Sequence, residues 1–134
     1  MIHRGGRFSI VVAVVGLVAA LLVPAVPALA NDDDVIREGN CSGASDWKLK
    51  LSPENGAIEV EWEIDQNVVG QTWGVAVEQN GTVVFRGART TTAPSGSFEL
   101  RIVRPNNAGP DSFRAAARNR TTGETCLGAA TATF

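Results

Sequence analysis

Three glutamates, Glu59, Glu61 and Glu63, alternate with apolar residues in the segment "AIEVEWEI". Alternate residues of an extended strand lie on one face about 6.5–7 Å apart, and inverting glycosidases hold their two carboxyl groups about 6.5–9.5 Å apart. A catalytic acid also needs a raised pKa, which comes from burial or from a close like charge. We expect Lys48 and Lys50 to lie beside these glutamates on a solvated outer face, so we interpret the pattern as cross-strand charge pairing rather than catalysis.

Side chains for other kinds of catalysis are scarce in this chain. His3 is the only histidine, and there is no tyrosine. Because His3 belongs to a segment interpreted below as a signal peptide, the mature chain has no histidine for Ser-His-Asp or Cys-His catalysis or for zinc. The aspartates at 32–34 are interpreted as a solvated run rather than as calcium ligands. We therefore predict no catalytic residue, no metal site, no cofactor and no enzymatic activity.

A group of arginines is the best candidate for a binding surface. The group comprises Arg86, Arg114, Arg118 and Arg120. Arg114 and Arg118 alternate with alanines, which places them on the outer face of a predicted strand. We expect Ala76 and Ala116 to give this face a smooth floor, suited to an acidic extracellular glycan or protein. A solvated face without a ligand is the alternative.

Aromatic residues suggest a second kind of binding, because sugars stack on exposed rings. The three tryptophans, Trp47, Trp62 and Trp73, all fall on the expected inward faces of strands, with Trp47 nearest the edge of the domain. We therefore predict a core rather than a sugar-binding platform. The aromatic core residues are expected to be Trp62, Trp73, Phe98 and Phe113.

The N-terminal segment, 1–30, has the features of a secretory signal peptide. A cationic start is followed by an apolar run from Phe8 to Val23 and by the small-residue sequence Ala28-Leu29-Ala30. Cleavage after Ala30 predicts a secreted, extracellular protein with no remaining membrane contact; an uncleaved membrane anchor is the alternative. The segment 31–43 is polar and aperiodic, and we expect a flexible acidic leader there.

Charge and cysteine content agree with export. Loss of Arg4 and Arg7 with the signal peptide would change the formal net charge from −2 to about −4, which argues against nucleic-acid binding. Cys41 and Cys126 are the only cysteines, and in an oxidising compartment we predict a disulfide between them rather than two free thiols. Closing so long a loop is worth about 4–5 kcal/mol in the chain-entropy model.

Period-two alternation dominates the chain after Cys41. It predicts seven strands, within the segments "DWKLKL", "AIEVEWEI", "TWGVAV", "TVVFRG", "SFELRI", "DSFRAAARN" and "TCLGAATATF". We therefore predict an all-β fold, a seven-stranded antiparallel Greek-key β-sandwich over 44–134, with a small β-barrel as the alternative. In the hairpin at Asn80-Gly81 we expect a three-residue loop with a bulge at Gly81, which would pair Val77 with Val83.

Three segments resemble a known family. "VEWEID", "TWGVAV" and "SFRAAARNRTTGE" are similar to strands B, C and F of fibronectin type III and related immunoglobulin-like domains. Phe113 stands where those domains have a tyrosine, so the resemblance implies the sandwich without its tyrosine-corner hydrogen bond. The blocks "KLKLSPENGAIEVEWEIDQN" and "APSGSFE" and the tail ending in "ATF" also resemble short secreted proteins of actinobacteria, which implies fold and export only.

These observations favour a non-catalytic role. We expect a secreted, disulfide-linked monomer that binds an extracellular protein or glycan or has a structural role. Three alternatives stay open: a small protease inhibitor that presents the loop "RTTTAPSG", a carbohydrate-binding module, and an enzyme that uses carboxylates alone.

Overall fold

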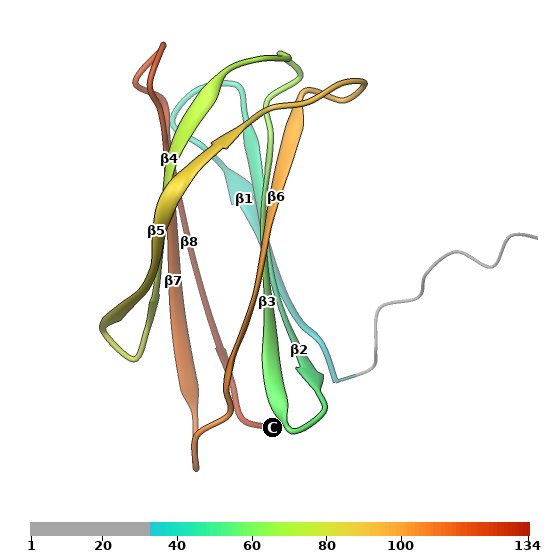
Figure 1. Cartoon of the computed structure of the whole chain (residues 1–134), viewed down its shortest axis with the longest axis vertical. Coiled ribbons are helices and arrows are strands. Elements are labelled where there is room, and N and C mark those ends of the chain that lie inside the picture. The colour runs from blue at the N-terminus through green and yellow to red at the C-terminus, as the bar shows by residue number, and fades with distance from the viewer. Residues whose placement is uncertain (1–32) are drawn as a thin grey trace, which may run out of the picture.

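A computed structural model describes residues 33–134, so the predicted signal peptide and its cleavage site lie outside the described residues. The described part forms eight β-strands: β1 Val35–Asn40, β2 Asp46–Glu54, β3 Ala57–Asp65, β4 Thr72–Gln79, β5 Thr82–Thr90, β6 Ser97–Pro105, β7 Asp111–Asn119 and β8 Thr125–Ala132. They make two four-stranded antiparallel sheets, ordered β1-β2-β3-β6 and β5-β4-β7-β8. Figure 1 shows the sheets as two facing layers of a sandwich. Nothing in the described part is a helix with the length and apolarity needed to cross a bilayer.

The prediction of seven strands is wrong by one. The additional strand is β1, which lies in the segment expected to be a flexible leader and pairs with β2 from Val35↔Leu51 to Asn40↔Asp46. Its backbone N–H and C=O groups pair with those of β2, which would otherwise be the open edge of the sheet, so β1 forms without an apolar repeat. Gly39 fits here because a β-carbon would lie 2.7 Å from the ring of Trp47.

The inward faces of both sheets form one apolar core. Trp62, Trp73 and Phe113 have no exposed surface, and Phe98 is 6% exposed. The remaining apolar core residues come mainly from β2, β3, β4, β7 and β8. Burying side chains of this size contributes about 1.5–3 kcal/mol each relative to leaving them in water, so the sandwich is stabilised chiefly by these two inner faces.

The β4–β5 hairpin differs from the predicted register. Asn80 and Gly81 both have positive φ, 50° and 83°, as a two-residue type I′ turn requires. The pairing runs Gln79↔Thr82 and Glu78↔Val83 and then shifts to Val77↔Phe85, so the bulge lies at position 84 instead of in the turn. The tight turn and the core contact of Phe85 are both retained this way.

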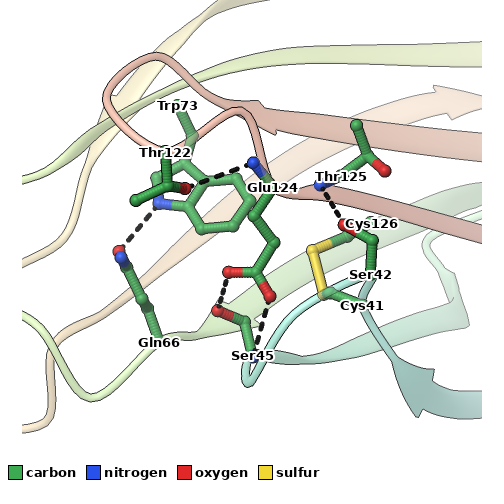
Figure 2. The surroundings of a disulfide bond; sticks show 9 residues. All are labelled: Cys41, Ser42, Ser45, Gln66, Trp73, Thr122, Glu124, Thr125 and Cys126. Atoms are coloured by element: carbon green, nitrogen blue, oxygen red, sulfur yellow. Dashed lines mark hydrogen bonds between the residues drawn. A yellow bond between two sulfur atoms is a disulfide. The ribbon is translucent and has the colours of Figure 1, made fainter.

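The predicted disulfide between Cys41 and Cys126 is present. It links the end of β1, in one sheet, to β8, in the other, across a sequence separation of 85 residues. Glu124 reinforces this link, because Ser45 donates to its carboxylate from the backbone N, at 2.9 Å, and from Oγ, at 2.6 Å (Figure 2). The N-terminal end of the domain is therefore attached to the last strand both covalently and by hydrogen bonds.

Candidate functional site

The candidate site is the outer face of the sheet β5-β4-β7-β8, where alternation exposes one side of each strand. The arginines predicted from the sequence come from β5 and β7 and from the turn after β7, and all are exposed. We call this surface the arginine face; it includes the four arginines, the small residues between them and one glutamate. It consists of Gly74, Ala76, Glu78, Arg86, Arg114, Ala116, Arg118 and Arg120.

Strand register fixes the positions of the arginines on this face. In β4 and β7, Glu78 lies opposite Arg114, Ala76 opposite Ala116, and Gly74 opposite Arg118. Arg86 of β5 pairs with Ala76 and is therefore level with the middle of these three rows. Arg114 and Arg118 are four residues apart on one strand, about 13 Å, with Arg86 two strands away. The three arginines surround the small floor formed by the two alanines.

This floor is hollowed. Two adjoining hollows share four lining residues, which are Ala76, Arg86, Ala116 and Leu127. Arg118 and Arg120 also line one of them, and Arg114, together with Glu78, lines the other. Both are open depressions rather than enclosed clefts, because glycine, which has no side chain, and alanine, which has only a methyl group, leave the centre of the sheet surface lower than its arginine rim.

No described carboxylate pairs with the four arginines within 4.0 Å. Glu78 faces Arg114 across the strands without forming such a pair. Guanidinium groups present several donors in a planar fork that fits carboxylate, sulfate or phosphate oxygens. The arginine face therefore offers unused donors to an anion.

The outer face of the other sheet is the opposite case, because its cations are engaged. Lys50 Nζ lies 2.7 Å from a carboxylate oxygen of Glu61, Arg101 also contacts that carboxylate, and Lys48 lies 3.7 Å from Glu63. Glu61 is only 6% exposed. Burial acts to raise the pKa of Glu61, but the hydrogen bond and charge of Lys50 and the charge of Arg101 outweigh it and lower the pKa. The expected cross-strand charge pairing is present at these positions.

Glu59 departs from that expectation. A hydrogen bond with the Glu54 carboxyl, together with burial, raises the pKa of Glu59 to about 7, although Arg101 acts in the other direction. The expectation that no carboxyl group on this face has a raised pKa is therefore wrong at Glu59. The hairpin between β2 and β3 brings the two glutamates together, a contact that strand periodicity does not reveal. The neighbouring Glu61 carboxylate is held in ion pairs by Lys50 and Arg101.

Two of the three tryptophans are buried in the core, as predicted, and the third is half-buried. Trp62 and Trp73 are fully buried. Trp47 is half-buried and packs on Trp62 with ring centroids 5.6 Å apart. It also lines a polar hollow with Asp46 and Asp65 at one end of the first sheet.

The loop 89–96, considered for protease inhibition, is anchored on both sides of its tip. Thr91 is 1% exposed and its Oγ1 donates to the carbonyl of Val68 at 2.6 Å. Thr92 forms a bridge with Ser97, and the residues 92–95 between these anchors are exposed. The loop is thus a short exposed tip on a fixed base.

Sequence reasoning missed two apolar residues at the margin of the arginine face. Leu127 is 67% exposed on β8, and Val83 is 44% exposed on β5. Leu127 had a signal, because it follows the inward Cys126 and must point outward. Val83 was expected on the inward face, paired with Val77, and this is wrong: the register of the hairpin pairs Val83 with Glu78 on the outer face.

The described residues contain no group of three or more His, Cys, Asp or Glu placed to hold a metal ion. Comparison with known proteins gives no assignment, since no family model and no curated protein matches the chain.

Proposed function

We propose that this protein is a secreted, non-catalytic binding domain whose arginine face holds an anionic extracellular ligand, on a protein or a glycan. The observation that carries the proposal is the absence of any described ion pair at the four arginines around a floor of Gly74, Ala76 and Ala116. An arginine–anion contact formed there adds charge-assisted hydrogen bonds without breaking an existing pair.

The topology supports an immunoglobulin-like or fibronectin III-like Greek-key sandwich as the scaffold. The segments similar to strands B, C and F lie on β3, β4 and β7. The sheet order β5-β4-β7-β8 then corresponds to C′-C-F-G, and β2-β3-β6 corresponds to A-B-E, with β1 as an addition. Such sandwiches bind through loops or through a sheet face, and the arginine face is the C′-C-F-G face.

The Cys41–Cys126 disulfide supports an extracellular location, because disulfides persist in oxidising compartments. The signal-peptide features of 1–30 point the same way. On this proposal the mature domain acts outside the cell, as a monomer, without a cofactor.

The test is binding of the purified mature domain to acidic probes, namely polyglutamate, polygalacturonate and a sulfated glycan. We expect at least one to bind at low salt and to weaken as salt rises. Reversal of one arginine charge, Arg114→Glu or Arg118→Glu, should weaken this binding by about tenfold or more, since a hydrogen bond to a charged group is worth about 1.5–3 kcal/mol.

The matched control is Arg37→Glu, which makes the same charge change at an exposed position of β1 in the other sheet. Arg37 donates only to the carbonyl of its neighbour Ile36, so its replacement leaves the ion pairs intact. Equal binding by all three variants and the wild type would refute the proposal.

A protease inhibitor is a second candidate, supported by the exposed tip 92–95 next to the anchored Thr91. It predicts stoichiometric loss of activity of an extracellular protease. It also predicts that a Ser95→Pro variant at the tip, and not Arg114→Glu, relieves that loss.

A further inference from the structure

We infer that the ligand of the arginine face is an extended polypeptide segment with the pattern acidic-x-aliphatic-x-acidic, bound along β7. This inference rests on the proposed function and narrows it from anions in general to one class of partner. It depends on the order of side chains along the sheet surface, on the exposed apolar residues at its margin and on the single acidic residue within it.

The outward residues of β7 follow the order arginine, alanine, arginine. Arg114, Ala116 and Arg118 occupy three successive rows of the sheet face. Rows are separated by two residues, about 6.5–7 Å. A ligand that uses both arginines must therefore present two negative groups up to about 13 Å apart, with a different group between them.

An extended peptide has this repeat. Its side chains i, i+2 and i+4 share one face at the same spacing as the sheet rows, because both are extended chains. Acidic residues at i and i+4 meet Arg118 and Arg114, and residue i+2 lies over Ala116. Ala116 offers that residue a small apolar floor, shared by the two hollows.

The middle row is apolar on the β8 side, which determines the character of residue i+2. Leu127 pairs with Ala116 and is 67% exposed, the largest exposed fraction among the large apolar residues of the described part. An aliphatic side chain over Ala116 covers Leu127 and removes both from water. A polyol chain in the same place would bring hydroxyl groups against this apolar surface without hydrogen-bond partners there.

The apolar middle row, together with the nearby Glu78, argues against a uniform polyanion. Glu78 lies beside Arg114 in the outermost row, next to the apolar Val83. A polymer that carries charge on every unit places a carboxylate over the apolar middle row as well as near Glu78, whereas a peptide with acidic groups only at i and i+4 leaves the middle row uncharged and brings a single carboxylate near Glu78. Arg86, level with Ala116, leaves room for one further negative group on the β5 side.

The experiment uses two synthetic peptides of equal composition and one glycan. The first peptide is capped Glu-Ser-Leu-Ser-Glu; the second, Glu-Leu-Ser-Ser-Glu, moves the leucine to the opposite face of an extended chain. The glycan is polygalacturonate. Affinities are measured by calorimetry at low salt with the purified mature domain.

The expected result is that the first peptide binds about tenfold more tightly than the second, because only its leucine reaches the apolar row. Leu127→Ser should abolish that difference while leaving the second peptide unchanged. This substitution is at an exposed position, and the thermal midpoint of the variant checks that the fold is intact. Arg114→Glu and Arg118→Glu should weaken both peptides.

Three outcomes overturn the inference. Equal arginine-dependent binding of the two peptides, or tighter arginine-dependent binding of polygalacturonate, refutes the peptide pattern and leaves the proposed function standing. Self-association of the wild type that Arg114→Glu abolishes identifies a second copy of the chain as the occupant. Absence of arginine-dependent binding by the two peptides, polygalacturonate, polyglutamate and the sulfated glycan removes the proposed function itself, and with it the inference.

Discussion

Asp111 is a buried carboxylate whose replacement should cost a large part of the stability of the domain. It is the first residue of β7 and has no exposed surface. Its oxygens accept hydrogen bonds from Gln79 Nε2 at 3.0 Å, from Asn80 Nδ2 at 2.9 Å, and from the backbone N and Nδ2 of Asn107 at 3.0 and 2.7 Å. These bonds fix the loop before β7 and the β4–β5 turn to one point.

The expected cost of Asp111→Ala follows from these partners. Gln79 is 6% exposed, so the loss of its bond to a charged acceptor costs about 1.5–3 kcal/mol. The donors of Asn80 and Asn107 belong to exposed residues that water can reach, and each of these losses costs about 0.5–1 kcal/mol. The free energy of unfolding should fall by about 3–6 kcal/mol, which lowers the thermal midpoint by at least about 12 °C in a domain of this size.

The pH dependence gives a second, independent readout. Burial acts to raise the pKa of Asp111, but the hydrogen bonds from Asn107, Gln79 and Asn80 outweigh it and hold the pKa below its usual value of 3.8. A carboxyl with a lowered folded-state pKa adds stability that is present above the unfolded-state pKa, about 3.9, and is lost as the pH falls through the folded-state pKa. The stability difference between wild type and Asp111→Asn should therefore be full at pH 7 and shrink below about pH 4.

Urea unfolding followed by tryptophan fluorescence measures both effects, at pH 7, 5 and 3. Asp46→Asn is the control, because it makes the same chemical change at an exposed position of β2. The reasoning fails if Asp111→Ala lies within about 0.5 kcal/mol of the wild type, the usual range for surface substitutions, if Asp111→Asn is no more destabilising than Asp46→Asn, or if the Asp111→Asn difference persists undiminished at pH 3.

Three further changes have expected outcomes. The raised pKa of Glu59, about 7, means that its contribution to stability is present below the unfolded-state pKa and is lost as the pH rises through 7. Urea unfolding from pH 5 to 8 should show this decline in wild type and not in Glu59→Gln. Glu54→Gln should lower the midpoint of the Glu59 titration seen by NMR, and an unmoved midpoint would contradict the assigned cause. Replacing Cys41 and Cys126 by serine should lower the free energy of unfolding by about 2–5 kcal/mol, and equal unfolding of wild type with and without reductant would contradict this. Gly128→Ala should lower the free energy of unfolding by about 1–3 kcal/mol through overpacking, because its new methyl group would lie 2.8 Å from the ring of Trp62 and 2.9 Å from that of Trp47. An unchanged thermal midpoint would show that these two rings can move aside.

The inward faces of most strands were predictable from the chain because alternation is a local property. In β3, for example, Ile58, Val60, Trp62 and Ile64 alternate with glutamates, and all four are buried as the pattern indicates. The disulfide was predictable for a different reason, since the chain has only two cysteines. Neither inference requires knowledge of which strands pair.

Features that depend on pairing were not predictable in the same way. β1 has no apolar repeat and forms because β2 leaves an open edge beside it. The raised pKa of Glu59 arises from Glu54 across the β2–β3 hairpin. Both effects depend on neighbours in a paired strand, which the alternation of residues along a single strand does not reveal.

The arginine face shows most clearly which features follow from alternation along one strand and which depend on strand pairing. Alternation along β7 places Arg114, Ala116 and Arg118 outward, and this much is local chemistry. The place of Arg86 was decided by the tertiary structure. A continuous register from the Asn80-Gly81 turn would pair Arg86 with Val75, on the inward face, whereas the one-residue shift at position 84 pairs it with Ala76 and turns it outward, because side chains alternate faces with every residue.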